Sequence, residues 1–188
     1  MSRFPLIALA LALVVTACGK KEEPVVVPTP TQTDGPVVTP PSDDDAARRA
    51  EEARRDSLAR AEAARAALVN EMATMIHFDY DQFSIRGADE ALLNRKAAIM
   101  RANPAVRIRV VGHADDRGSD EYNLALGMRR ATAAKEYLVR LGIEAGRIEV
   151  ASLGEEVPLD PAQNESAWAT NRRGEFEIIA GNQTLRAP

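Results

Sequence analysis

Polar residues gather between residues 110 and 131, in the stretch VVGHADDRGSDEYNLALGMRRA. His113 stands two positions before Asp115, and the stretch ends in the adjacent pair Arg129 and Arg130. Residues of these types can ligate a metal ion, transfer protons during hydrolysis, or bind a charged ligand. Each kind of site needs different partners elsewhere in the chain, so the rest of the sequence distinguishes between them.

A catalytic metal centre would draw on both histidines of the chain. His77 precedes Asp79 much as His113 precedes Asp115. Such a centre needs about three convergent protein ligands and an open position, so the two histidine segments would have to meet in space. The segment that starts at Asp79 lacks the glycine that a calcium loop carries at its sixth position. No Gly-x-Ser-x-Gly motif marks a nucleophilic serine, and we predict a binding protein without enzymatic activity, metal or cofactor.

The spacing of the polar residues fits a binding pocket. Asn123, Gly127 and Arg130 fall in one row of a predicted helix at 119–141, at i, i+4 and i+7. Asp115 lies in the loop before that helix. We expect Gly127 to leave a gap between two polar side chains, where a carboxylate can face a guanidinium fork. The alternative is a structural ion pair between Asp115 and Arg130 that holds the loop to the helix.

The hydrophobic pattern predicts the elements that position these residues. Alternation in AVRIRVVGHA at 105–114 is typical of a strand with one solvated face. Helices are predicted at 87–103 and 119–141, the second with Ser119 as N-cap and with Leu124 and Met128 in its buried stripe. Further strands are expected at 75–80, 147–154 and 174–180. This order predicts an α/β domain, a βαβαββ two-layer sandwich with helices on one face of a mixed sheet.

Four motifs occur in the order found in one family. They are IHFDYDQFSI at 76–85, GHADDRGSDEYNLALGMRRA at 112–131, SLGEEVP at 152–158 and NRRGEFEI at 171–178. With these motifs the chain resembles the OmpA-like peptidoglycan-binding domain, and within that family its lipoprotein members. The resemblance covers nearly the whole predicted domain, residues 74–182, which a short tail follows at 183–188.

The resemblance implies a function and a site. It implies non-covalent binding of the stem peptide of peptidoglycan, chiefly its diaminopimelate, which carries an ammonium and a carboxylate on one carbon. In that reading Asp115 takes the ammonium and Arg130 takes the carboxylate. Gly127 stands where many OmpA-like domains have serine. The other residues expected to line the site are Phe78, Asp79, Arg117, Gly118, Asn123 and Arg173.

The N-terminal region predicts a lipid anchor. In residues 1–17, Arg3 precedes a short apolar run, which is typical of a secretory signal peptide. VTAC at 15–18 resembles a lipobox, in which Cys18, the only cysteine, is acylated. An ordinary cleaved signal with an incidental cysteine is the alternative. Gly19 is not the aspartate that commonly marks inner-membrane retention, so we expect an outer-membrane lipoprotein that faces the periplasm.

Two further segments separate the anchor from the domain. Residues 18–45 are rich in proline and predict a disordered tether. Residues 46–73 are rich in alanine, arginine and glutamate and predict a charged spacer helix outside the core of the domain. Leu58, Leu68 and Met72 have heptad-like spacing, so a coiled-coil dimer is the alternative.

Composition limits the partners. The net charge is −4 and aromatic residues make up 4% of the chain, so neither phosphate neutralisation nor base stacking favours a nucleic acid. The expected partners are peptidoglycan and, through the lipid anchor, the outer membrane, with a TolB-like periplasmic protein as a further candidate. The alternatives are an OmpA-like envelope protein without Tol partners and a metal-dependent cell-wall hydrolase.

Overall fold

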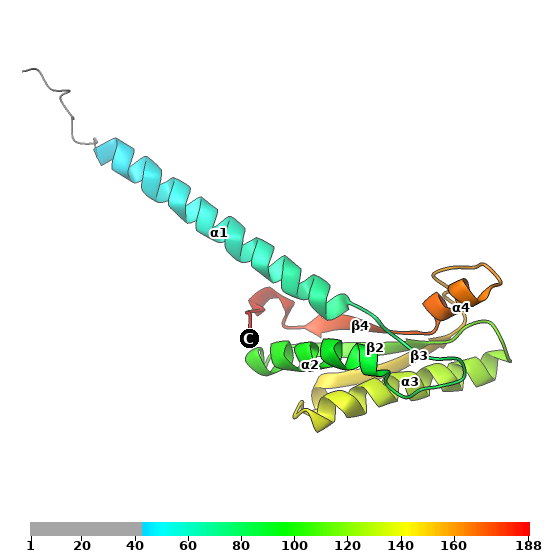
Figure 1. Cartoon of the computed structure of the whole chain (residues 1–188). Helices are drawn as coiled ribbons and strands as arrows, with labels where there is room; N and C mark the ends of the chain where they lie inside the picture. The colour runs from blue at the N-terminus through cyan, green and yellow to red at the C-terminus, as the bar shows by residue number, and fades with distance from the viewer. Residues whose placement is uncertain (1–42) are drawn as a thin grey trace, which may run out of the picture. The chain divides into compact units, whose positions relative to one another are not determined.

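The computed structural model describes residues 43–188, so the predicted signal peptide, Cys18 and most of the predicted tether lie outside the described residues. Two single 3₁₀ turns, Ala145–Arg147 and Asn182–Thr184, accompany the regular elements. None of the helices in residues 43–188 is both long and apolar enough to cross a membrane. The regular elements in chain order are α1 (Asp43–Ala73), β1 (Ile76–His77), α2 (Gly87–Ala102), β2 (Arg107–His113), α3 (Asp120–Arg140), β3 (Ile148–Gly154), α4 (Glu165–Asn171) and β4 (Arg173–Ala180) (Figure 1).

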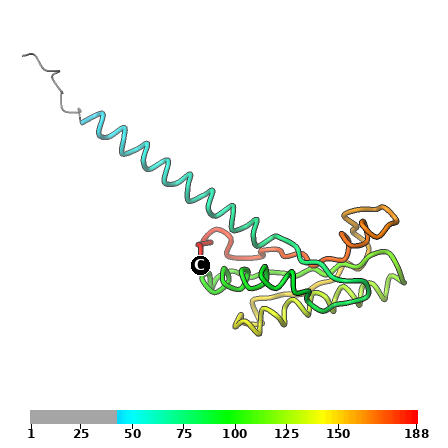
Figure 2. Tube along the Cα trace, viewed as in Figure 1, coloured from blue at the N-terminus to red at the C-terminus, as the bar shows by residue number. Residues whose placement is uncertain are grey.

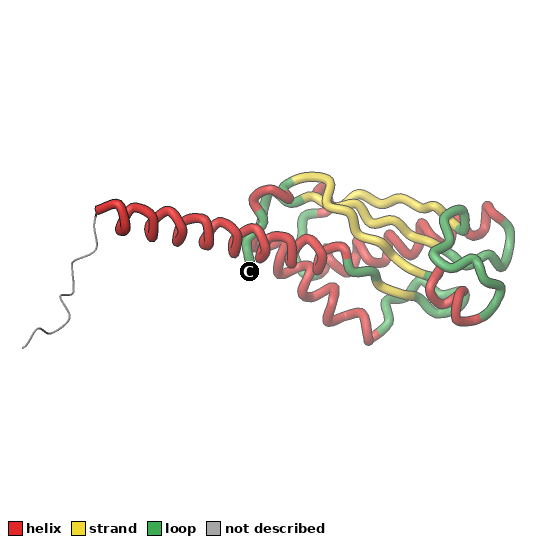
Figure 3. The backbone as a smooth tube through the Cα atoms, turned by 90° about the horizontal axis from the view of Figure 1, so that it is seen from above, coloured by secondary structure: helices red, strands yellow, loops and turns green. Residues whose placement is uncertain are grey.

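The strands lie side by side in one sheet (Figure 3). The sheet is mixed, and its strand order is β1-β4-β2-β3. β2 pairs parallel with β3, because α3 provides the crossover between them, and antiparallel with β4. Ile108 and Val110 are fully buried. Arg107 and Arg109 alternate with them and both reach Glu149, at 3.4 and 3.1 Å. The predicted α/β sandwich with a mixed sheet is confirmed, with β1 shortened to two residues and α4 added in the loop before β4.

The buried face of α3 differs from the predicted stripe. Leu124 and Met128 are 48% and 41% exposed, so their predicted place in the core is wrong. The polar row that contains Asn123 and Arg130 faces inward instead. The physical reason is that both polar side chains find hydrogen-bond acceptors inside the fold, which makes their burial possible. Arg130 donates to backbone carbonyl oxygens, and Asn123 donates to a carbonyl oxygen and to the Glu155 carboxylate. The buried residues of α3 are Asn123, Leu126, Gly127, Arg130, Ala131, Ala134 and Leu138.

The last two turns of α1 belong to the core, which corrects the expectation that the spacer helix stays outside it. Leu68 and Met72 lie within the main hydrophobic cluster. Lys96 of α2 is fully buried, its ammonium donates to the carbonyl oxygens of Glu71 and Met72, and it lies 4.2 Å from the centre of the Phe176 ring. α1 has no basic residue in its own last turn, so Lys96 supplies the cation at this helix end.

The burial of Lys96 against the end of α1 removes its ammonium from water and bears on where the folded domain begins. Burial lowers the pKa of this ammonium to about 7. The backbone carbonyls of α1 are the acceptors that make this burial tolerable. The folded domain therefore begins near Leu68 and not at residue 74. Because Leu68 and Met72 are used inside the protein, they are not available as the seam of a coiled-coil dimer.

The remaining length of α1 is solvated, as predicted for a charged spacer. α1 is already helical at Asp43, the first described residue and three residues before the predicted start, and the acidic residues Asp43, Asp44 and Asp45 suit a first helical turn. Exposed ion pairs join Glu51 to Arg55 at 3.0 Å and Asp56 to Arg60 at 3.8 Å. Such pairs stabilise a solvated helix by only about 0.3–0.5 kcal/mol each. Apart from Arg65, whose guanidinium donates to the Gln183 carbonyl oxygen at 3.2 Å, this part of α1 therefore depends mainly on local propensity.

The C-terminal segment is not a free tail, which corrects the prediction for 183–188. Leu185 is 6% exposed and lies in the main hydrophobic cluster. At the end of α2, the Asn103 side chain accepts from the backbone N–H of Arg186 and donates to its carbonyl oxygen, both at 2.8 Å. Figure 2 shows the chain end (red) beside the end of α2. The segment therefore covers the core at the end where α2 stops.

Candidate functional site

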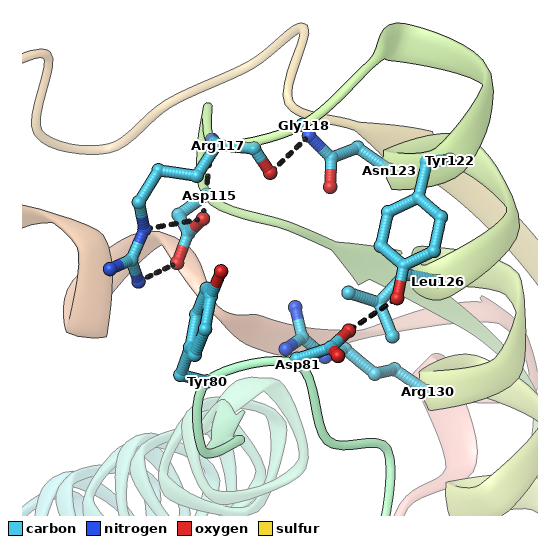
Figure 4. Close-up of a pocket in the computed structure, with 9 residues that line it drawn as sticks. All are labelled: Tyr80, Asp81, Asp115, Arg117, Gly118, Tyr122, Asn123, Leu126 and Arg130. Atoms are coloured by element: carbon cyan, nitrogen blue, oxygen red, sulfur yellow. Dashed lines mark hydrogen bonds and ion pairs between the residues drawn. The ribbon is translucent and has the colours of Figure 1, made fainter.

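A pocket of about 230 Å³ opens where β2 ends and α3 begins (Figure 4). Three segments build it: the loop after β1, the loop after β2, and the first turns of α3. Of the residues predicted for the site, the pocket brings together five, contributed by the second and third segments. The full lining is Tyr80, Asp81, Asp115, Arg117, Gly118, Tyr122, Asn123, Leu126 and Arg130.

Two glycines bring α3 close to the sheet beneath this pocket. A Cβ atom at Gly112 would clash with the backbone of Gly127, and a Cβ atom at Gly127 would clash with the Ser152 hydroxyl and the Gly112 carbonyl. The expectation that Gly127 leaves a gap between two polar side chains is therefore wrong, because β2 and β3 fill that space. The close approach instead holds Asn123 and Arg130 under the carboxyl end of β2.

Arg130 is the buried cation of the site. Its side chain is 0% exposed, and its guanidinium donates to the carbonyl oxygens of Gln82 at 2.9 Å, His113 at 2.7 Å and Asp79 at 3.1 Å. These acceptors are neutral, and no carboxylate of residues 43–188 forms an ion pair with Arg130. Burial lowers the pKa of Arg130 to about 10, so it stays charged at neutral pH. The alternative of a structural ion pair between Asp115 and Arg130 is not what the structure contains.

Three donor contacts of Arg130 leave part of its guanidinium unused. A guanidinium has five N–H groups in a fork that matches a carboxylate. Two of these groups remain after the three carbonyl contacts, and Arg130 lines the pocket. Asp115 and Asp81 favour the charged form of Arg130 without a direct ion pair in residues 43–188, and a buried charge that lacks a direct partner is costly. An anion that enters the pocket would relieve that cost.

Asp115 is the buried carboxylate of the site. It is 4% exposed and receives hydrogen bonds from the side chains of Arg117 and Arg172. Burial alone would raise the pKa of Asp115, but the hydrogen bonds from the two arginines outweigh burial and hold the pKa below its ordinary value. Asp115 is therefore ionised at neutral pH, and its charge is matched by guanidinium groups other than Arg130.

The loop between Asp115 and α3 is fixed by its own polar contacts. The Asn123 amide donates to the Arg117 carbonyl oxygen at 3.3 Å and to the Glu155 carboxylate. Ser119 caps α3 as predicted, since its side chain accepts from the Tyr122 backbone N–H at 3.3 Å. Gly118 has φ +125°, a conformation that favours glycine. The loop thus holds its backbone against the rim of the pocket.

Three residues predicted for the site do not line this pocket. Phe78 is buried in the core below Arg130, with its ring centre 5.2 Å from the guanidinium carbon, and Asp79 contributes only its backbone carbonyl oxygen. Arg173 pairs with Glu175 at 2.7 Å and donates to the Val157 carbonyl oxygen. Its chain neighbour Arg172 is the arginine that reaches Asp115.

Several residues at the site were missed from the sequence. Tyr80 and Asp81 line the pocket and directly follow Phe78 and Asp79 in the chain, which were predicted for the site. The Tyr122 hydroxyl donates a hydrogen bond to the Asp81 carboxylate (Figure 4). Tyr80 and Asp81 both belong to the motif IHFDYDQFSI, so the sequence pointed to their segment. Residue types alone, however, do not show which way a loop turns. Trp168, whose ring lies 4.1 Å from the Arg117 guanidinium, comes from a segment with no predictive pattern.

The geometry of the histidines does not support the alternative of a metal-dependent hydrolase. Within residues 43–188, no three His, Cys, Asp or Glu side chains converge as ligands of an ion. His113 is 1% exposed on β2, an inner strand, with its Nε2 3.6 Å from a Glu175 carboxylate oxygen. Burial, reinforced by the nearby Arg173, lowers the pKa of His113 to about 4, so it is neutral at neutral pH.

Comparison with known proteins finds a matching family and relatives of this chain. The sequence model of the OmpA family matches residues 77–172, a range that contains every residue of the pocket lining. The peptidoglycan-associated lipoprotein of Pasteurella multocida (strain Pm70) is 42% identical over 98 residues, which are 52% of this chain and 65% of that protein. The protein of the same name from Rhizobium meliloti (strain 1021) is 45% identical over 98 residues, 52% of this chain and 56% of that protein. The match thus spans just under two thirds of the first relative.

A solved structure extends the similarity to the fold. The crystal structure of the peptidoglycan-associated lipoprotein from Burkholderia pseudomallei superposes with a TM-score of 0.55 at 38% sequence identity. The superposition covers 55% of this chain and 88% of that one. The predicted resemblance to lipoprotein members of an OmpA-like family is confirmed by these relatives.

Proposed function

The chain belongs to the OmpA family, and from this premise we propose that it binds peptidoglycan non-covalently through the diaminopimelate of the stem peptide, without enzymatic activity. The single observation that carries the proposal is Arg130, a buried guanidinium that lines a pocket and has no carboxylate partner in residues 43–188. A site of this kind is suited to an anionic group of a ligand. The names of the relatives support peptidoglycan as the source of that group.

The rest of the pocket suits the other half of an amino-acid zwitterion. Asp115 and Asp81 both line it and supply negative charge, Asp115 across the pocket from Arg130 and Asp81 on the same side as Arg130 (Figure 4). Diaminopimelate presents an ammonium and a carboxylate on one carbon, so its two charges match an aspartate and an arginine that face one pocket. We propose Arg130 for the carboxylate and Asp115 for the ammonium, with Gly118 and Asn123 at the rim.

We also propose that Cys18 carries a lipid anchor that holds the chain to the outer membrane, facing the periplasm. The relatives named lipoproteins support an anchor, and stable attachment usually takes more than one acyl chain. The solvated part of α1 would then act as a spacer between the anchor and the pocket. A TolB-like partner stays a prediction from the resemblance alone.

Competition with stem peptides tests the binding proposal. The tetrapeptide L-Ala-γ-D-Glu-meso-diaminopimelate-D-Ala and the same peptide with L-lysine in the third position differ by one carboxylate. Since Arg130 would lose its counter-ion with the lysine peptide, the diaminopimelate peptide should release the full chain from purified insoluble cell wall at concentrations at least about a hundredfold lower. Equal release by both peptides, or by neither, would refute binding through diaminopimelate.

Fractionation of cells tests the anchor. With wild-type Cys18 the chain should be recovered with outer-membrane vesicles, because acyl chains add about 0.8 kcal/mol of membrane affinity per buried CH₂ group. Cys18→Ser should give either a soluble periplasmic protein or an unprocessed precursor. A fully processed Cys18→Ser protein that still sediments with the outer membrane would show that Cys18 is not the attachment point.

A further inference from the structure

The acceptor positions of Asp115 are all occupied in the structure. One carboxylate oxygen accepts from the backbone N–H of Arg117 at 3.3 Å and from its Nε at 3.2 Å, and the other accepts from Arg117 Nη2 at 2.6 Å and Arg172 Nη1 at 3.0 Å. An ionised carboxylate offers about four acceptor positions. A ligand ammonium therefore finds no free acceptor on Asp115 while both guanidinium groups are in place.

The guanidinium of Arg117 sits between two aromatic rings. The centres of the Tyr80 and Trp168 rings each lie 4.1 Å from its central carbon. Cations are attracted to ring faces at such distances, and more strongly when they are partly desolvated. The slot formed by the two rings and the Asp115 carboxylate is thus a complete site for a cation, and a side chain of the protein fills it.

Of the two arginines on Asp115, only Arg117 is placed to leave. The Arg172 side chain is 7% exposed and also donates to the Phe78 carbonyl oxygen at 3.1 Å and to Glu165 at 2.7 Å. The Arg117 side chain is 28% exposed, and its remaining charged partner is the exposed carboxylate of Glu165 at 3.5 Å. Arg117 can therefore move into solvent while Arg172 stays and supports the carboxylate.

From these contacts we propose that Arg117 is an internal competitor of the ligand. Its guanidinium occupies the ammonium subsite, which is the slot between Tyr80, Trp168 and Asp115, and the ammonium of the bound amino acid replaces it there. The inference rests on the proposed function, because it assigns a subsite for the ammonium of the same ligand. It adds Trp168, which lies outside the pocket lining, as a ligand contact, and it gives Arg117 a role opposite to that of a binding residue.

The sign of the effect of Arg117→Ala tests the proposal. Without the guanidinium, the slot is empty and the ligand no longer has to displace an ion pair, so the full-length variant should bind the diaminopimelate tetrapeptide about tenfold more tightly than the wild type in calorimetry. Arg117→Lys serves as a second variant if the alanine protein melts below the assay temperature. Its single ammonium cannot reproduce the two parallel side-chain N–H contacts of Arg117 to Asp115, so it should compete less and bind with intermediate affinity.

Tryptophan fluorescence distinguishes displacement of Arg117 by the ligand from a purely structural role of this side chain. Trp168 is the only tryptophan of the chain. Its emission should change when the tetrapeptide binds to the wild type, because a guanidinium leaves its ring face. In the ligand-free state, Arg117→Ala should already differ in emission from the wild type.

The possible outcomes separate this inference from the proposed function. Weaker or unchanged affinity of Arg117→Ala, with normal binding by the wild type, would overturn the inference and leave the proposed function standing. Saturation of the wild type without a change in Trp168 emission would overturn it as well. Failure of the tetrapeptide to bind either protein would overturn both.

Discussion

Arg130→Met should lose binding to the cell wall and also melt at a lower temperature than the wild type. The methionine fills similar space but offers no N–H group, so the ligand carboxylate loses its partner and the carbonyl oxygens of Asp79, Gln82 and His113 each lose a donor. The bond to His113 is buried, and the Asp79 oxygen keeps the backbone N–H of Gln82 as a donor. A buried acceptor without a donor costs about 1–3 kcal/mol. Removal of an unpaired buried charge offsets part of that cost. We expect a net loss of about 2–4 kcal/mol in the free energy of unfolding and no measurable wall binding.

Ligand-induced stabilisation separates the two effects of Arg130→Met. A ligand that binds only the folded state raises the melting temperature by mass action, so the diaminopimelate tetrapeptide should stabilise the wild type and leave the variant unchanged. The matched control is Arg129→Ala. Arg129 directly precedes Arg130 in α3 and is exposed. Its replacement by alanine should change neither the stability of the protein nor its binding to the tetrapeptide. A folded Arg130→Met protein that still gains stability from the tetrapeptide would show that the anion is held elsewhere.

The site shows which parts of a pocket can be predicted from a sequence. Helical spacing correctly placed Asn123 and Arg130 on one face and beside the loop of Asp115, because that relation depends only on the geometry of one helix. The partners of Arg130 could not be predicted in the same way. Two of them are backbone carbonyls of the loop after β1 and the third is the carbonyl of His113 at the end of β2, and the path of an irregular loop has no periodic signal. The aspartate and the arginine were expected to face each other, whereas each is held by different groups.

The arginines of NRRGEFEI illustrate the same limit. Both Arg172 and Arg173 are buried and polar, and only the exact start of β4 decides which one reaches Asp115. A shift of one residue along a strand moves a side chain to the other face, and strand ends are poorly defined by composition. The fold was predictable because alternation and helical periodicity repeat over many residues. The direction of a single side chain at a strand end depends on one position.

The spacer helix shows a different limit. The spacing of Leu68 and Met72 correctly indicated an apolar stripe, but the same stripe can pack on a second helix or on its own domain. Lysine is a residue type that is usually exposed, and the burial of Lys96 in α2 depends on carbonyl oxygens at the end of α1. Whether a helix ends on its own domain is thus decided by tertiary contacts that a pattern does not contain.

A fragment of residues 74–188 should be much less stable than a fragment of residues 60–188, although both contain every residue of the pocket lining. The shorter one lacks Leu68 and Met72, which are 7% and 0% exposed in the protein. Truncation of a buried leucine or methionine to alanine costs about 2–5 kcal/mol. The shorter fragment also loses the carbonyl acceptors of Lys96. Since small domains are stable by only about 5–15 kcal/mol, it should be largely unfolded at 37 °C.

Thermal melting followed by circular dichroism measures this difference, and point variants of the full chain locate its cause. Met72→Ala should lower the free energy of unfolding by about 2–4 kcal/mol, because the cavity it leaves lies in the main hydrophobic cluster. Leu58→Ala is the matched control on the same helix. Leu58 is 56% exposed, so its loss should change stability by less than about 0.5 kcal/mol. Equal melting temperatures for the two fragments would mean that the end of α1 contributes nothing to the core, and that a solvated spacer reaches as far as residue 73.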